Sequence, residues 1–177
     1  MRSLFVIGGA RSGKSRYAQQ RVEVLPGKLA FIATAQAQDD ELADRIARHR
    51  ADRGPRWTAY EAPIALCDAI EHASRECEAI LIDCMTLWLS NLMHADADIA
   101  AATADLMAAI RVCSAPLTIV SNEVGGGIVP MNALARRFRD HAGWLHQQLA
   151  SVAGEVVLVT AGLPLQLKCA EPSAMQR

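Results

Sequence analysis

Short apolar runs recur along the chain, and segments with helical spacing separate most of them. Runs that are apolar on both faces are typical of strands in a parallel sheet with helices packed on each side. The predicted strands are residues 4–7, 29–32, 80–82, 117–120 and 156–159. The predicted helices are residues 14–24, 39–53, 63–77, 96–112 and 132–153. We therefore expect an α/β fold with a mostly parallel central sheet and helices on both faces.

Glycine and proline gather in three stretches between these elements, residues 54–57, 123–130 and 161–164, which predicts loops there. Ligand-binding loops of a parallel sheet follow the carboxyl ends of its strands. Three consecutive glycines at 125–127 allow the second stretch to be either a mobile lid or a fixed turn. We expect the chemistry of the protein in these loops and in the glycine-rich stretch after the first strand.

Length and composition limit the classes of protein that fit. A chain of 177 residues predicts a single domain over 1–177, and its 51% hydrophobic and 21% charged residues are typical of a globular protein. A net charge of -1 gives no general positive field, so we expect no nucleic acid partner. The apolar run at 4–7 is too short for a signal segment, and no later run approaches the roughly 18 apolar residues of a membrane span. We therefore expect a cytoplasmic protein without a membrane span.

The five cysteines are odd in number and never in C-x-x-C spacing. This pattern argues against a disulfide framework and against a zinc knuckle. We expect them to be small apolar side chains in a reducing compartment.

The glycine-rich stretch after the first predicted strand matches the phosphate-loop motif G-x-x-x-x-G-K-[ST], and a predicted helix follows it. Its residues are Gly8, Gly9, Ala10, Arg11, Ser12, Gly13, Lys14 and Ser15. Backbone N–H groups of such a turn, together with a helix N-terminus, bind phosphates. Lys14 would reach the β- and γ-phosphates, and the Ser15 hydroxyl would bind Mg²⁺. The alternative is a turn that only joins strand to helix, which the Lys-Ser pair and the strand-turn-helix context disfavour.

Asp83 ends a later apolar run, where phosphate-loop proteins carry an acidic residue for Mg²⁺. The alternative is that Asp83 only caps the next helix.

The phosphate loop alone does not choose among a kinase, a switch GTPase, a motor-like ATPase and a nucleotidyltransferase. A guanine-reading N-K-x-D after the fourth predicted strand would favour a switch GTPase, but residues 121–124 read SNEV. The D-x-x-G at 140–143 falls in a predicted helix instead of following a strand. Both observations count against a switch protein.

The predicted helix at 39–53 carries a stripe that begins with Leu42 and Ile46 and continues with His49 and Arg53. Arginines at 45, 48, 50 and 53 surround the histidine and suit a polyanionic ligand such as a triphosphate. They would also favour neutral, nucleophilic imidazole, whereas acidic residues at 44 and 52 would oppose this. Spacing alone leaves a functional and a structural role for His49 equally open.

A series of motifs, taken in order from residue 4 to about residue 168, closely resembles the bifunctional adenosylcobinamide kinase/adenosylcobinamide-phosphate guanylyltransferase family. The motifs are GGARSGKS at 8–15, ATA at 33–35, DDELADRIARHRADR at 39–53, W-x-x-x-E-x-P at 57–63, DCMTLWLSN at 83–91, SNEVGGGIVP at 121–130 and R-x-F-R-D-x-x-G at 136–143. Two departures, His146 before Gln147 and Ala18 before Gln19, stand where the family often has asparagine and Ala-Glu. They bear on substrate affinity or assembly and leave the phosphate loop and His49 untouched.

The resemblance implies two steps in vitamin B12 assembly. Adenosylcobinamide is phosphorylated by ATP or GTP, and GMP is then transferred from GTP through a guanylylated histidine, which matches His49, giving adenosylcobinamide-GDP and pyrophosphate. It implies catalytic roles for His49, Lys14 and Asp83, with Mg²⁺ at Ser15 and Asp83. It also implies a RecA-like phosphate-loop fold and a homotrimer. Beyond the phosphate loop, the implied nucleotide-binding residues are Ala33, Thr34, Ala35, Arg50, Ala51, Asp52, Arg53, Glu61 and Asp83.

Two other functions remain open from the sequence. One is a monofunctional small-molecule kinase in which His49 has no transfer role. The other is a nucleotide-binding regulatory protein that changes shape with the bound phosphate.

Overall fold

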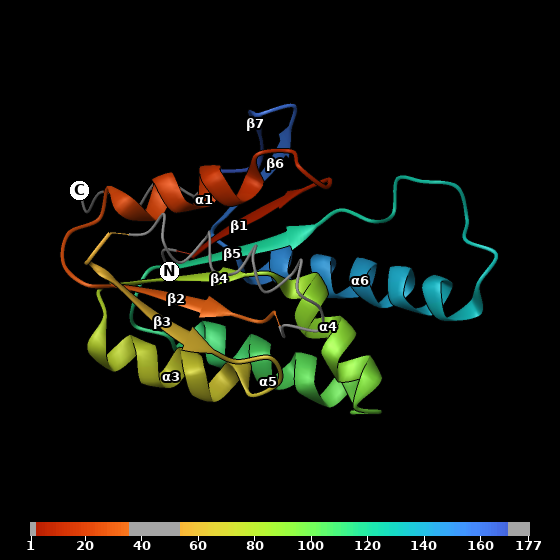
Figure 1. Ribbon diagram of the computed structural model, residues 1–177, viewed down its shortest axis with the longest axis horizontal. Helices are drawn as coiled ribbons and strands as arrows, with labels where there is room; N and C mark the ends of the chain where they lie inside the picture. The colour runs from red at the N-terminus through yellow and green to blue at the C-terminus, as the bar shows by residue number, and fades with distance from the viewer. Residues whose placement is uncertain (1–2, 36–53, 170–177) are drawn as a thin grey trace, which may run out of the picture.

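A computed structural model describes residues 3–35 and 54–169, whose seven strands form one sheet (Figure 1). The strands are β1 (Ser3–Gly8), β2 (Leu29–Ala33), β3 (Trp57–Glu61), β4 (Ala79–Asp83), β5 (Leu117–Asn122), β6 (Glu155–Thr160) and β7 (Leu163–Lys168). Their order across the sheet is β3-β2-β4-β5-β1-β6-β7. Neighbouring described strands pair in parallel, apart from the antiparallel β6–β7 pair. Strands β4 and β1 are therefore separated by one strand, β5.

Helices cover both faces of this sheet. They are α1 (Lys14–Glu23), α3 (Leu66–Glu76), α4 (Met85–His94), α5 (Ile99–Val112) and α6 (Ala133–Val152). Figure 1 shows α1 on one face and the other four described helices on the opposite face. Side chains alternate accordingly along β1: Leu4 and Val6 pack with α1, whereas Phe5 and Ile7 face the opposite layer. This arrangement confirms the predicted α/β phosphate-loop fold with a mostly parallel central sheet.

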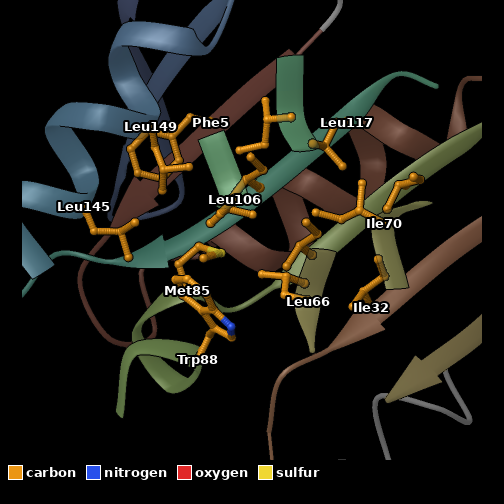
Figure 2. Close-up of a cluster of buried hydrophobic side chains, with 14 of the residues drawn as sticks. Phe5, Ile32, Leu66, Ile70, Met85, Trp88, Leu106, Leu117, Leu145 and Leu149 are labelled. Atoms are coloured by element: carbon orange, nitrogen blue, oxygen red, sulfur yellow. The ribbon is translucent and has the colours of Figure 1, made fainter. Parts of the chain in front are cut away.

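The larger hydrophobic cluster lies between the sheet and the four-helix layer. Figure 2 shows part of it, with side chains of α3, α4, α5 and α6 meeting those of β1, β2 and β5. Trp88 of α4 is fully buried there, and its indole N–H donates a hydrogen bond to the carbonyl of Ile64 at 3.0 Å. A buried indole thus has the polar partner that it needs.

All five predicted strands are present, each longer by one or two residues than its apolar run. Four predicted helices are also present with small shifts at their ends. Asn132 and Asp98 cap α6 and α5, so both helices begin just after these residues instead of including them. The predicted helix at 63–77 begins later, at Leu66. The predicted helix at 39–53, including His49, lies outside the described residues.

Three described elements were not predicted. Strands β3 and β7 lie at the two edges of the sheet and bury few side chains, so neither gives a continuous apolar run. The predicted loops at 54–57 and 161–164 are therefore partly wrong: β3 begins at Trp57 and β7 begins at Leu163. Helix α4 was not predicted, although its buried apolar side chains Met85, Trp88, Leu89 and Leu92 have helical spacing. Leu87 and Met93 make the stretch apolar beyond this one stripe. In the described parts of the chain, none of the helices combines the length and apolar composition needed to cross a membrane.

The packing predicts a large effect of truncating a core side chain. Replacing Ile70, which is buried in the larger cluster, with alanine should lower the free energy of unfolding by about 3 kcal/mol because it leaves a cavity. Urea unfolding followed by circular dichroism measures this change. The matched control is Val112→Ala at the exposed end of α5, which should change stability by less than about 0.5 kcal/mol. Equal effects of the two substitutions would contradict the assigned core.

Candidate functional site

The phosphate-loop motif occupies the turn between β1 and α1. Helix α1 begins at Lys14, and its N-cap Gly13 has φ +92° and no side-chain cap among the described residues. The first N–H groups of α1 therefore remain available to an anion, and the helix dipole favours negative charge at this end. The predicted phosphate-binding turn has the geometry that the motif requires.

Glycine is needed at two positions of this loop. A Cβ on Gly8 would lie 2.4 Å from the carbonyl oxygen of Val159 on β6 and 2.7 Å from Ser12 Oγ. Gly13 adopts a left-handed conformation, and a Cβ there would lie 3.3 Å from the Cα of Gly162. The loop is therefore packed closely against the end of β6 and the turn that follows it.

Three backbone and side-chain contacts hold the loop in place. The N–H of Gly162 donates to the Ser12 carbonyl at 2.9 Å, and the N–H of Glu123 donates to the Gly8 carbonyl at 2.9 Å. Farther along α1, the Arg21 guanidinium donates two hydrogen bonds of 2.9 and 2.8 Å to the Glu155 carboxylate on β6. These two hydrogen bonds from Arg21 lower the pKa of the Glu155 carboxyl group and keep the pair ionised. The loop and its helix are thus fixed to both neighbours of β1.

The polar side chains of the loop are placed for phosphate. Lys14 is 8% exposed, and its Nζ folds back to donate to the Gly9 carbonyl at 3.3 Å. Ser12 Oγ is buried and has no hydrogen-bond partner in the described structure. A buried hydroxyl without a partner is costly, and a bound phosphate oxygen would satisfy it. Ser15, the second residue of α1, is half-buried.

Several predicted binding residues share the carboxyl edge of the sheet with this loop. The strand register places Ala33 of β2 directly between Glu61 of β3 and Asp83 of β4. On the other side of β4, Gly8 of β1 is in register with Asn122 of β5. Predicted site residues from four strands therefore line one edge.

The charges of Lys14 and Asp83 both affect the pKa of the Cys84 thiol. Burial raises the pKa of the Cys84 thiol, the nearby Asp83 carboxylate raises it further, and the Lys14 ammonium opposes these effects. The phosphate-loop lysine therefore lies near the end of β4. Asp83 does not cap α4, since the N-cap is Cys84.

The residues present fit a magnesium ion held jointly with phosphates. Nowhere in residues 3–35 and 54–169 do three or more His, Cys, Asp or Glu side chains gather as a metal-binding group. Mg²⁺ in nucleotide sites needs no such cage, because one or two protein oxygens, phosphate oxygens and waters complete its octahedron. Oxygens of the required type come from Ser15 at the start of α1 and from Asp83 at the end of β4.

The threonine of the predicted A-T-A segment has a structural contact. Thr34 is fully buried, and its Oγ1 accepts from the Cys84 N–H at 2.9 Å and donates to the Cys84 carbonyl at 2.7 Å. Asn91 of α4 donates to the Thr34 carbonyl at 2.8 Å. Thr34 thus joins the ends of β2 and β4, and the nucleotide contacts of residues 33–35 stay a prediction.

Sequence reasoning missed two polar pairs beside the loop. Asn122 Nδ2 donates to Thr86 Oγ1 at 2.8 Å, which joins β5 to α4. Ser121 Oγ and His146 Nε2 are 2.7 Å apart, which joins β5 to α6. The partners are far apart in sequence, so no local motif indicated either pair. The only signal was His146 itself, as a departure from the family pattern.

The His146 side chain is largely buried, with 11% of it exposed. Burial lowers the pKa of its imidazole below the ordinary histidine value, and the Glu123 carboxylate, 4.0 Å from Nδ1, opposes this only in part. The ring also packs against Phe5 of β1. His146 therefore holds α6 against the strand that ends at the phosphate loop.

The remaining predicted site residues, His49, Arg50, Ala51, Asp52 and Arg53, lie outside the described residues. Their roles stay predictions. The five cysteines, all of which are described, are free.

The close approach at Gly8 predicts an asymmetry within the motif. Gly8→Ala should lower the free energy of unfolding by about 2 kcal/mol, because the new methyl group meets a backbone carbonyl that cannot move away alone. Gly9→Ala is the matched control, since its Cβ would meet nothing within 4 Å. Urea unfolding without nucleotide compares the two. Equal stability of both variants would show that the loop does not pack on β6 as described.

The buried imidazole predicts a pH dependence. A histidine with a lowered folded-state pKa stabilises the fold above its unfolded-state pKa, and this stability is lost as the pH falls below that value. His146→Gln keeps an amide near Ser121 and removes the titration. The variant should therefore lose less stability than the wild type between about pH 7.5 and about pH 5. The control is His94→Gln, on the exposed surface of α4. Identical dependence of stability on pH in His146→Gln and the wild type would contradict the lowered pKa of His146.

Comparison with known proteins assigns the chain to a family. The model of the family described as cobinamide kinase/cobinamide phosphate guanyltransferase matches residues 4–167. The bifunctional adenosylcobalamin biosynthesis protein CobP of Pseudomonas aeruginosa is 41% identical over 170 residues, covering 95% of this chain and 98% of the relative. The bifunctional adenosylcobalamin biosynthesis protein CobU of Escherichia coli is 39% identical over 180 residues, covering 93% and 99%.

A solved protein of Pyrococcus horikoshii OT3 has the same fold, with a TM-score of 0.51 over 96% of this chain and 87% of its own, at 8% identity. That likeness concerns the fold alone. The sequence matches extend over nearly the whole chain and include the phosphate loop and Asp83. The chain belongs to the cobinamide kinase/cobinamide phosphate guanyltransferase family.

Proposed function

We propose that this protein phosphorylates adenosylcobinamide with ATP or GTP and then transfers GMP from GTP to the resulting phosphate. The observation that carries the proposal is the uncapped start of α1, with Lys14 buried against it and Asp83 on the same edge of the sheet. Family membership supplies the acceptor, a cobinamide.

In the kinase step, the hydroxyl oxygen of the acceptor forms a bond to the γ-phosphorus while the bond from that phosphorus to the β–γ bridging oxygen breaks. The nucleoside diphosphate leaves, and the hydroxyl proton passes to a base or to solvent. Backbone N–H groups of the loop and the Lys14 ammonium stabilise the negative charge on the phosphate oxygens. The rigid bracing of the loop keeps these donors aligned, which is the main work of a protein in phosphoryl transfer.

Ser15 and Asp83 would hold Mg²⁺ against the phosphates. A bound Mg²⁺ would neutralise negative charge on the phosphates. One strand separates β4 from β1, so the ends of these two strands are about 10 Å apart. Asp83 would hold the ion across this distance either directly or through a water molecule.

In the transfer step, a nitrogen of His49 bonds to the α-phosphorus of GTP, and the bond to the α–β bridging oxygen breaks to release pyrophosphate. A phosphate oxygen of the cobinamide phosphate then attacks the same phosphorus, the N–P bond breaks, and free histidine returns. This splits one difficult displacement into two easier ones. The role of His49 and the nucleotide contacts at Arg50, Ala51, Asp52 and Arg53 rest on the resemblance, as does assembly into a homotrimer.

The experiment is an intact-mass measurement after incubation with GTP and Mg²⁺. The wild type should gain the mass of one GMP in an acid-labile bond, and His49→Ala should gain none. His141→Ala on α6 is the control and should gain the adduct as the wild type does. Nucleotide-dependent phosphate transfer to adenosylcobinamide is measured in parallel.

The two other functions give different results. A monofunctional kinase would transfer phosphate without ever carrying GMP. A regulatory protein would retain nucleotide tightly and transfer neither group. Either result would overturn the two-step proposal.

A further inference from the structure

The loop between β5 and α6, residues 123–132, begins directly beside the phosphate loop. Asn122 at the end of β5 is in register with Gly8, and the N–H of Glu123 donates to the Gly8 carbonyl at 2.9 Å. Figure 1 shows the β5–α6 loop extending beyond the sheet edge before the chain returns along α6. A molecule reacting at the phosphate loop would therefore have this loop as a neighbour.

Large apolar side chains of this region face solvent. Ile128 is 97% exposed and Met131 is 98% exposed. Val124, Val129 and Leu134 are also exposed. Single exposed apolar residues need no explanation, but five within eleven residues are typical of a binding surface.

Hydrogen bonds hold the two ends of the β5–α6 loop. The Arg136 guanidinium donates to the carbonyls of Pro130 at 2.9 Å and Met131 at 2.6 Å. The Asn132 side chain accepts from the N–H groups of Leu134 and Ala135, and the Glu123 carboxylate accepts from the Gly125 N–H. These contacts reduce the freedom of the two ends of the loop, so ordering those ends costs little further entropy when a ligand binds.

We propose that the β5–α6 loop, with Leu134, is the docking surface for the corrin ring of the acceptor. This inference rests on the proposed function. A cobinamide has a broad macrocycle with methyl groups on its faces and amide side chains around its rim. The apolar side chains of Ile128 and Met131 suit the faces, and backbone of the loop outside helices and strands offers N–H and C=O groups to the amides.

The position of the surface matches the shape of this substrate. The reacting hydroxyl is on a short side chain and must reach the γ-phosphate, while the macrocycle is too large to enter the phosphate loop. A docking surface must therefore lie just outside the loop, at the carboxyl edge of the sheet. The β5–α6 loop meets this requirement, because its first residue is hydrogen-bonded to the phosphate loop.

The test is the double variant Ile128→Ser/Met131→Ser. We expect the KM for adenosylcobinamide to rise about tenfold or more, since two apolar side chains no longer contact the ring. The KM for the nucleotide and the rate of self-guanylylation by GTP should stay within about twofold, because neither residue belongs to the nucleotide site. Both side chains are almost fully exposed, so the melting temperature should not change.

The matched control is Val112→Ser. Val112 is an exposed apolar residue at the end of α5, which leads to the amino end of β5, away from the phosphate loop. It should leave both KM values unchanged. Retention of adenosylcobinamide in equilibrium dialysis, read from its visible absorbance, checks the KM result independently of turnover.

Three outcomes would overturn the inference. An unchanged KM for adenosylcobinamide in an active double variant would refute the docking surface alone. A changed sedimentation coefficient with an unchanged KM would assign the surface to contacts between copies of this chain. A wild type that carries GMP but transfers no phosphate to adenosylcobinamide would overturn the kinase proposal and this inference together.

Discussion

Backbone N–H groups can bind a polyphosphate only if nothing else in the protein satisfies them, and this constraint governs the centre of the structure. The start of α1 must be left without a side-chain cap, and Gly13 at the N-cap position has no side chain to provide one. Gly8 lets the loop pack closely against β6. A loop with unsatisfied donors needs support from outside itself. Glu123 after β5 and Gly162 after β6 provide it through backbone hydrogen bonds. The two strands beside β1 therefore position the site as well as the core.

The sequence predicts the interior of the fold better than its edges. Central parallel strands are apolar on both faces, so β1, β2, β4, β5 and β6 appear as continuous runs. The edge strands lack this signal: β3 contacts one neighbour, and β7 has only exposed residues and contains Pro164, which an edge strand tolerates. Helix α4 does carry helical spacing at Met85, Trp88, Leu89 and Leu92, so the sequence contained a signal for it that was not used.

The same distinction applies to the site. The phosphate loop is one continuous motif whose geometry depends on neighbouring residues, so it could be predicted in full, and Asp83 follows from its place at the end of a strand. Ser121 and His146 are 25 residues apart, and Asn122 and Thr86 are 36 apart. Only the packing of α6 and α4 on β5 brings these partners together. The exposure of the β5–α6 loop likewise depends on where Arg136 fixes it, which no spacing rule states.

The place of β1 in the sheet has a consequence for synthesis of the chain. Strand β1 pairs with residues 117–122 and 155–159, so both of its partners are translated more than 100 residues after it. At roughly 5 to 20 residues per second, the nascent β1 waits roughly 7 to 30 seconds for its second neighbour. Helix α1, which covers Leu4 and Val6, follows β1 directly, whereas the edge of β1 that pairs with β6 lacks its partner for the whole of that time. The support that β6 and Gly162 give to the phosphate loop therefore becomes available only after residue 162 has been translated.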